Sequence, residues 1–410
     1  MLGLNPHTAS RKLNVKSRAD PEHPAVVNTP TGETIPVYEQ EFWTSRQRQA
    51  SPIHEISYRA CFKPQLPAYF IDRLTQEGDL VYDPFSGRGT TAIEAALRGR
   101  IVMANDVNPL SAVLTYPRLE LPSVTDIDTR LRALKFSARP PSGLDLSMFF
   151  HPDTEYELLG LREYLYRRAR SGHEDSADRW IRMVATNRLT GHSAGFFSVY
   201  TLPPNQAVSA EDQVRINARL KQEPEYRDIR ALILKKTMQL QGRLSAAERW
   251  RLRKAAEEAL LLSKDARGTR EIPTDSVQLT VTSPPFLDVV QYARDNWLRC
   301  WFNGFDAEAV SSRITMAREV EQWTGEMAGV FAELYRVTRP GGWVAFEVGE
   351  VRRGAVKLDE IVAPIGLEAG FACEAILINA QRFTKTANIW GVSNNKLGTN
   401  SNRIVLFRKA

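Results

Sequence analysis

The sequence is poor in cysteine and has no long apolar run. Its three cysteines, Cys61, Cys300 and Cys373, are widely spaced and odd in number, so they favour neither a disulfide framework nor a Cys-x-x-Cys metal site. No stretch approaches the roughly 20 apolar residues of a membrane span, and the first residues lack the apolar core of a signal peptide. We therefore expect a cytoplasmic protein with reduced thiols, without a metal site and without membrane attachment.

Charge of neither sign dominates, although basic residues are in excess. The chain has 410 residues, of which 43% are hydrophobic, enough for one large domain or two. A net charge of +6 at pH 7 permits a polyanionic partner without requiring one. The excess is concentrated between residues 215 and 270, where basic residues outnumber acidic ones about two to one.

A glycine-containing loop connects a predicted strand to a predicted helix. Residues 80–82 are typical of a buried strand and residues 92–97 of a helix, and DPFSGRGTT (83–91) lies between them. This order is typical of nucleotide-binding folds, in which glycines such as Gly87 and Gly89 allow a tight turn and a close backbone approach. Asp106 follows the next predicted strand, where an acid would bind a ribose hydroxyl.

Dinucleotides and S-adenosylmethionine both bind to loops of this kind, and the glycines do not distinguish them. Asp83 opens the loop. Its carboxylate would repel the negatively charged pyrophosphate of a dinucleotide, whereas it would attract a positively charged sulfonium or amino group.

A second unusual stretch is TSPPF (282–286), which follows the apolar, β-branched run 277–281. Each proline fixes φ and contributes a carbonyl without a competing N–H, so a strand that ends here presents hydrogen-bond acceptors in set positions. Such an edge suits a flat ring that carries an amino group. Taken alone, this pattern more often indicates a strand that simply ends in a Pro-Pro turn.

Together these stretches resemble the motifs of the amino-group DNA methyltransferases. Residues 83–91 are similar to the family's cofactor motif, and residues 282–286 to its catalytic motif in the cytosine-N4 form. FKPQLP (62–67) resembles the segment before the cofactor loop, and VTRPGGWV (337–344) the turn into the fifth strand of class I methyltransferases. Two features depart from the family: the cofactor motif precedes the catalytic one, and Arg88 stands where a small residue is usual.

The resemblance implies an α/β fold of the class I methyltransferase, Rossmann-like type, with a mixed seven-stranded sheet interrupted by a largely helical insertion. We expect an N-terminal arm (1–54), a catalytic domain (55–112 and 275–410) and a mainly helical insertion (113–274) that is a candidate target-recognition region. The implied cofactor is S-adenosylmethionine.

The resemblance also assigns residues to roles in methyl transfer. The Ser283 hydroxyl and the Pro284 carbonyl would accept the N–H groups of the cytosine N4 amine and aim its lone pair at the sulfonium methyl. Phe286 would stack on a base flipped out of the duplex. The catalytic set is Ser283, Pro284, Pro285 and Phe286, and the cofactor set is Lys63, Pro64, Asp83, Pro84, Phe85, Ser86, Gly87, Gly89, Thr90, Thr91, Asp106 and Val107.

Contacts with double-stranded DNA are expected from basic helices of the insertion, from the polar and aromatic loop 187–200, and from a long polar loop near the C-terminus. A cognate restriction endonuclease is a second candidate partner, and the nucleoid the expected location. The candidate DNA-binding residues are Arg188, His192, Arg249, Arg251, Arg253, Lys254, Arg382 and Lys385.

Three alternatives to a cytosine-N4 DNA methyltransferase stay open. An adenine-N6 enzyme would use the same acceptors for its amine, and an RNA base methyltransferase would share the cofactor loop. A regulatory nucleic-acid-binding protein with this fold would bind the cofactor without turnover. Residues 283–286 argue against a dehydrogenase.

Overall fold

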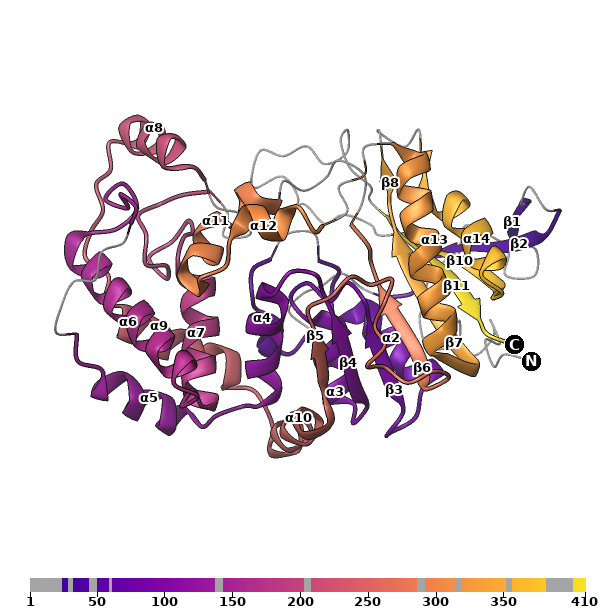
Figure 1. The fold of residues 1–410 in the computed structure, drawn as a ribbon, viewed down its shortest axis with the longest axis horizontal. Helices are drawn as coiled ribbons and strands as arrows, with labels where there is room; N and C mark the ends of the chain where they lie inside the picture. The colour runs from indigo at the N-terminus through magenta and orange to yellow at the C-terminus, as the bar shows by residue number, and fades with distance from the viewer. Residues whose placement is uncertain are drawn as a thin grey trace.

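The structure is a computed structural model in which a sheet with flanking helices adjoins a group of helices (Figure 1). It describes residues 24–28, 32–43, 50–58, 61–136, 143–202, 208–285, 292–314, 317, 319–351, 356–380 and 401–410. Within these residues the main sheet has nine strands. In spatial order they are β1 (Ala25–Asn28), β2 (Thr34–Gln40), β10 (Ala372–Ala380), β11 (Ser401–Arg408), β7 (Thr338–Val348), β6 (Val277–Thr282), β3 (Leu80–Asp83), β4 (Ile101–Asn105) and β5 (Leu260–Leu262).

Seven of these strands, from β10 to β5, form the sheet of a class I methyltransferase. The five strands β7, β6, β3, β4 and β5 run parallel, and β11 runs antiparallel to both of its neighbours, β7 and β10. A short antiparallel pair, β8 (Glu350–Val351) and β9 (Val356–Lys357), lies outside this sheet. The predicted fold class is confirmed.

The predicted domain boundaries differ from the strand positions at two places. The antiparallel pair β1–β2 lies within the predicted N-terminal arm, yet β2 pairs in parallel with β10 and extends the sheet. β5 lies within the predicted insertion, yet it pairs with β4 at the other edge. Short edge strands have weak sequence signals because their side chains are only partly buried.

The helices of the catalytic part cover both faces of the sheet. Because side chains alternate along a strand, Val281 and Ala345 pack in one apolar cluster, and Val344 and Phe346 in the other. Helices α2 (Gln65–Leu74) and α3 (Thr90–Leu97) cover the first face, and α13 (Val320–Val337) and α14 (Leu358–Glu368) the second. No helix in the described part of the chain is long and apolar enough to cross a bilayer.

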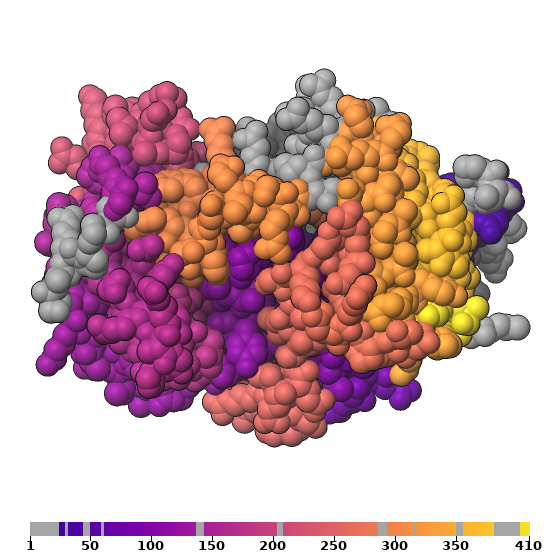
Figure 2. Space-filling model, in the orientation of Figure 1, coloured from indigo at the N-terminus to yellow at the C-terminus, as the bar shows by residue number. Residues whose placement is uncertain are grey.

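The insertion is helical, as predicted. Several of its helices begin at a Ser or Asp whose side chain accepts a backbone N–H, the usual N-cap arrangement. Its elements and their neighbours are α4 (Leu110–Leu119), α5 (Val124–Ala133), α6 (Pro152–Arg170), α7 (Ser176–Arg188), α8 (Ala210–Leu220), α9 (Ile229–Gln241), α10 (Ala246–Glu258), α11 (Tyr292–Asn303) and α12 (Ala307–Ser311). Residues 292–311, coloured orange, adjoin the insertion above the sheet (Figure 2).

Residues 51–58, which we call the strap, include the short 3₁₀ helix η2 (Pro52–His54) and join the catalytic part to the insertion. Asn187 of α7 bonds both backbone groups of Ser57, at 2.9 and 3.1 Å, and Arg299 of α11 donates to the Ser57 carbonyl at 3.1 Å. From the catalytic part, Arg88 donates to the carbonyl of Ile56 at 2.8 Å. Arg88, unusual for the family motif, thus binds the strap in this chain.

Arg118 of α4 supports the same segment from inside the protein. Its side chain is fully buried, and its guanidinium donates to the carbonyls of Leu114, Ile53 and Arg88. Burying a cation whose hydrogen-bond partners are neutral carbonyls costs free energy. Removing it, however, leaves three buried carbonyl oxygens without a hydrogen-bond donor.

We expect Arg118→Met to lower the free energy of unfolding by about 3 kcal/mol, because buried carbonyls lose their donor. Urea unfolding followed by circular dichroism measures the change. Arg132→Met is the matched control, since the Arg132 side chain is 78% exposed; it should change stability by less than about 0.5 kcal/mol. Equal effects of the two substitutions would contradict a special role for Arg118.

Candidate active site

The predicted cofactor loop lies at the carboxyl end of β3 and bonds to the end of β4. Ser86 N donates to the Asn105 carbonyl at 2.9 Å, and Gly89 N to the Ser86 carbonyl at 2.7 Å. Gly87 N donates to an Asp106 carboxylate oxygen at 2.7 Å. The sequence predicted that the glycine loop and Asp106 would bind the same cofactor, and the two are in direct contact in the structure.

Asp106 is half-buried at the end of β4. Its second carboxylate oxygen accepts the Asn108 N–H at 2.9 Å. Burial raises the pKa of Asp106 to about 6, opposed by its two backbone hydrogen bonds. Each oxygen has a second lone-pair direction, so the carboxylate can accept ribose hydroxyls at the place where Rossmann-like folds bind them.

Asp83, the first residue of the loop, joins the two motifs. It is almost completely buried, and one oxygen accepts the Thr282 hydroxyl at 2.6 Å and Phe85 N at 3.1 Å. Burial raises the pKa of Asp83 to about 7. No basic side chain of the described residues is among the causes of this shift, so a bound cationic group would stabilise the carboxylate.

The predicted catalytic motif continues from the end of β6, beside this loop. Ser283 and Pro285 are partly exposed, whereas Pro284 between them is buried. Trp323 of α13 donates its indole N–H to the Pro285 carbonyl at 2.9 Å. On the other side, the Thr91 hydroxyl of α3 donates to the Val281 carbonyl at 3.0 Å. The strand end is thus held from two helices.

Two contacts at the cofactor loop escaped sequence reasoning. A Cβ on Gly87 would lie 3.5 Å from the Tyr58 ring, and Asn108 Nδ2 donates to the Tyr58 hydroxyl at 2.8 Å. The strap therefore covers one side of the loop. Tyr58 lies shortly before the segment that resembles the family, but no spacing rule relates it to Asn108.

The residues present fit a cofactor that carries a positive charge and a ribose. Within the described part of the chain the buried Ser86 hydroxyl has no hydrogen-bond partner, which is costly unless a ligand supplies one. Four residues at the carboxyl edge of the sheet are partly exposed, namely Phe85, Gly87, Asp106 and Val107. Of the other predicted cofactor residues, Lys63 and Pro64 lie directly before α2, with Pro64 as its N-cap. Thr90 accepts a hydrogen bond from Arg88, and Pro84, Gly89 and Thr91 are buried.

Arg188 and His192, both predicted to bind DNA, pack around Phe196. Arg188 is 9% exposed, with its guanidinium carbon 4.1 Å from the centre of the Phe196 ring. The half-buried His192 ring lies 6.1 Å from the same ring. Burial lowers the pKa of Arg188 to about 10, with a further contribution from Arg299. Arg188 is therefore part of the packing between α7 and the following loop.

The basic residues of α10 lie away from the catalytic motif. Arg249 donates to Gln241, Arg251 to the Leu97 carbonyl at the end of α3, and Arg253 to the Leu121 carbonyl. Lys254 lies 5.2 Å from the centre of the exposed Trp250 ring. In Figure 1, α10 is at the bottom of the molecule, whereas α11 and α12 lie in its upper half.

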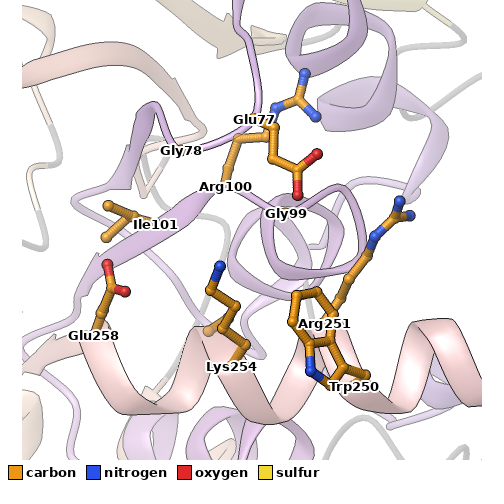
Figure 3. A pocket seen from close by; sticks show the side chains of 10 residues that line it. Glu77, Gly78, Gly99, Arg100, Ile101, Trp250, Arg251, Lys254 and Glu258 are labelled. Atoms are coloured by element: carbon orange, nitrogen blue, oxygen red, sulfur yellow. The ribbon is translucent and has the colours of Figure 1, made fainter.

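A pocket of about 290 Å³ separates α10 from the amino ends of β3 and β4 (Figure 3). Its lining includes Arg251 and Lys254 but also Glu77 and Glu258, so its charge is mixed. Because Gly78 precedes β3 and Gly99 precedes β4, the pocket is at the edge of the sheet opposite the cofactor loop. The structure therefore does not bring this basic set together with Ser283. Three further predicted residues, Phe286, Arg382 and Lys385, lie outside the described residues.

Comparison with known proteins bears on the same motifs. Residues 7–109, which contain the cofactor loop and Asp106, match the model of the N6/N4 methyltransferase family, described as DNA methylase. The resemblance to the amino-group DNA methyltransferases is confirmed. Methyltransferases of this fold take their methyl group from S-adenosylmethionine, the cofactor for which Asp83 and Asp106 are suited.

Two curated relatives are named as type II methyltransferases. The chain is 31% identical over 77 residues to the type II methyltransferase M.MjaII of Methanocaldococcus jannaschii, covering 18% of this chain and 14% of that protein. It is 27% identical over 110 residues to the type II methyltransferase M.MvaI of Kocuria varians, covering 26% and 23% respectively. The matches thus span less than a quarter of either relative.

Among solved structures, a DNA modification methylase of Thermus thermophilus is 25% identical. The alignment covers 35% of this chain and 50% of that one, with a TM-score of 0.22. The fold assignment rests instead on the strand order and direction of this sheet.

Proposed function

We propose that this protein is a site-specific DNA methyltransferase that transfers the methyl group of S-adenosylmethionine to the N4 amine of a flipped cytosine in double-stranded DNA. The observation that carries the proposal is the 2.6 Å hydrogen bond from Thr282 to Asp83. It ties the cofactor loop to the serine-proline motif of the cytosine-N4 type. A cognate restriction endonuclease is part of the proposal as a further partner.

The chemistry follows from the atoms at the end of β6. The exocyclic amine of cytosine is a weak nucleophile because its lone pair is delocalised into the ring. Acceptance of its N–H groups by the Ser283 hydroxyl and the Pro284 carbonyl localises that lone pair on nitrogen and orients it. The bond from Trp323 to Pro285 fixes the backbone that carries these acceptors. The bound cofactor supplies an electrophilic methyl group.

The substrate base is the finer part of the proposal. Short acceptors serve the adenine N6 amine equally well, and the matched family covers both N6 and N4 methylation. Serine before the two prolines favours cytosine, as in the cytosine-N4 form of the motif.

The test is parallel incubation of the protein with unmethylated duplex DNA or with RNA in the presence of methyl-labelled S-adenosylmethionine, followed by nucleoside digestion and mass spectrometry. We expect label in N4-methylcytosine. Ser283→Ala should reduce the rate by about 100-fold or more with unchanged cofactor affinity. Ser171→Ala is the matched control, because Ser171 is exposed and belongs to the insertion.

Each other outcome contradicts a different part of the proposal. Label in N6-methyladenine would refute the assigned base but keep the site and its mechanism. Label in RNA but not in DNA would refute the assigned nucleic acid. Cofactor binding without any labelled product would indicate a regulatory protein.

A further inference from the structure

A buried histidine and a buried glutamate join the strap to helix α3. The His54 ring nitrogen Nε2 lies 2.6 Å from a carboxylate oxygen of Glu94. His54 is 4% exposed and Glu94 is 5% exposed. Helix α3 begins directly after the cofactor loop, with Gly89 as its N-cap, and Glu94 belongs to its second turn. The contact therefore fixes the strap to the helix that follows the cofactor loop.

The same strap ends against the cofactor loop itself. Four residues after His54, the Tyr58 hydroxyl accepts the Asn108 amide N–H at 2.8 Å. The Tyr58 ring lies 3.5 Å from the position that a Cβ on Gly87 would take. Backbone N–H groups of Gly87 and Asn108 both donate to the carboxylate of Asp106, at 2.7 and 2.9 Å. The strap thus forms one wall of the proposed cofactor site, and the position of Tyr58 depends on how the strap is held.

The surroundings of His54 favour an uncharged ring. Its other ring nitrogen, Nδ1, is buried and has no hydrogen-bond partner within the described part of the chain. A proton on Nδ1 would therefore be a buried donor without an acceptor. Burial lowers the pKa of His54, and the opposing attraction of Glu94 is smaller. The neutral ring that donates its Nε2–H to the Glu94 carboxylate leaves a single acceptor unsatisfied.

The charged side chains around this pair come from four parts of the protein, and they are Glu94 and Arg98 of α3, Arg88 of the cofactor loop, Arg118 of α4 and Lys236 of α9. Arg98 donates to the second carboxylate oxygen of Glu94, and Lys236 lies 3.6 Å from the carboxylate of Glu55. Arg88 and Arg118 donate to strap carbonyls. These two guanidinium groups disfavour a further positive charge on the His54 ring.

We infer that His54 is a positioning residue for the cofactor: its bond to Glu94 holds the strap on α3 and thereby holds Tyr58 against the cofactor loop. This inference deepens the proposed function and rests on it for the identity of the ligand. Protonation of His54 weakens the attachment, because the second ring N–H and the added charge find no partner in the buried site. The strap is therefore fully held above about pH 6.5, the ordinary pKa of histidine, and opens more often as the pH falls below it.

Hydrogen exchange followed by mass spectrometry tests this attachment without an activity assay. Amides of the strap are hydrogen-bonded, among them those of His54 and Ser57, so exchange of the peptide 51–58 reports how often the strap opens. After correction for the pH dependence of exchange itself, opening of the wild type should increase about tenfold between pH 7.5 and pH 5.5. His54→Gln should show no increase, because its amide donates to Glu94 but does not take up a proton. His173→Gln, at an exposed site between α6 and α7, should match the wild type.

Release of the cofactor tests whether the strap holds it. Bound, labelled S-adenosylmethionine is displaced by an excess of unlabelled cofactor, and the dissociation rate is measured for the wild type and His54→Gln. The ratio of the two rates should rise about tenfold between pH 7.5 and pH 5.5. Asp83 and Asp106 also titrate in this range, but both proteins contain them, so the ratio isolates the effect of His54. Saturating cofactor should in turn protect the amides of 51–58, because coupling between two sites is reciprocal.

Two results would overturn the inference. An equal pH dependence of strap exchange in the wild type and His54→Gln would show that His54 does not hold the strap. A constant ratio of release rates, or a strap that bound cofactor does not protect, would show that the strap does not position the cofactor. A protein that binds S-adenosylmethionine but methylates no nucleic acid would refute the proposed function, whereas the exchange and release rates would still decide the role of His54.

Discussion

Asp83→Asn should stabilise the free protein at pH 8 and at the same time weaken cofactor binding. Burial raises the pKa of Asp83 in the folded protein to about 7 from its usual 3.8. Between these two values the folded state holds a proton that the unfolded state has released. The free energy of unfolding therefore falls as the pH rises through this window, by up to about 4 kcal/mol at pH 8, and is unaffected by Asp83 below pH 4.

Asparagine removes this loss because it does not ionise, and its Oδ1 can still accept from Thr282 and Phe85. Urea unfolding at pH 5 and pH 8 should show a smaller pH dependence in the variant than in the wild type. Calorimetric titration should show S-adenosylmethionine binding at least about tenfold more weakly, since a charged hydrogen-bond partner is lost. Asp145→Asn is the control: Asp145 is exposed and its pKa is lowered by Ser147, so no gain at pH 8 is expected. Parallel pH curves for the wild type and Asp83→Asn would contradict the interpretation.

Local motifs predicted which residues meet at the glycine loop. Strand, glycine loop and helix are determined by neighbouring residues, and the acid after the next strand lies at a fixed distance along the chain. The contact between Gly87 and Asp106 therefore followed from sequence spacing. The mixed seven-stranded sheet followed from the family resemblance.

Contacts set by tertiary packing could not be predicted in this way. The hydrogen bond from the Asn108 amide to the Tyr58 hydroxyl joins residues 50 positions apart in the chain, and it depends on how the strap packs against the cofactor loop. The basic side chains of α10 illustrate the opposite case, because sequence cannot distinguish a guanidinium that binds phosphate from one such as Arg251 that satisfies a helix-end carbonyl.

Gly89→Ala should disrupt the cofactor loop more than any other single-methyl substitution in it. Gly89 has a φ of +75° at the N-cap of α3, a conformation that costs a residue with a Cβ about 1–2 kcal/mol. A Cβ there would also lie 2.2 Å from the Thr115 hydroxyl oxygen of the buried α4 face. Helix α3 or α4 has to move to make room, at a further cost of about 1–3 kcal/mol.

We therefore expect Gly89→Ala to lower the free energy of unfolding by about 4 kcal/mol and to abolish measurable S-adenosylmethionine binding, because the loop backbone that approaches the cofactor is displaced. Gly172→Ala separates the two causes. Gly172 has a φ of +70° but no atom of the described residues within 4 Å of its added Cβ, so only the backbone strain of about 1 kcal/mol should appear and cofactor binding should be unchanged. If the two variants lose equal stability, the contact between α3 and α4 does not restrict the loop; if Gly89→Ala binds the cofactor normally, the loop backbone does not form the cofactor site.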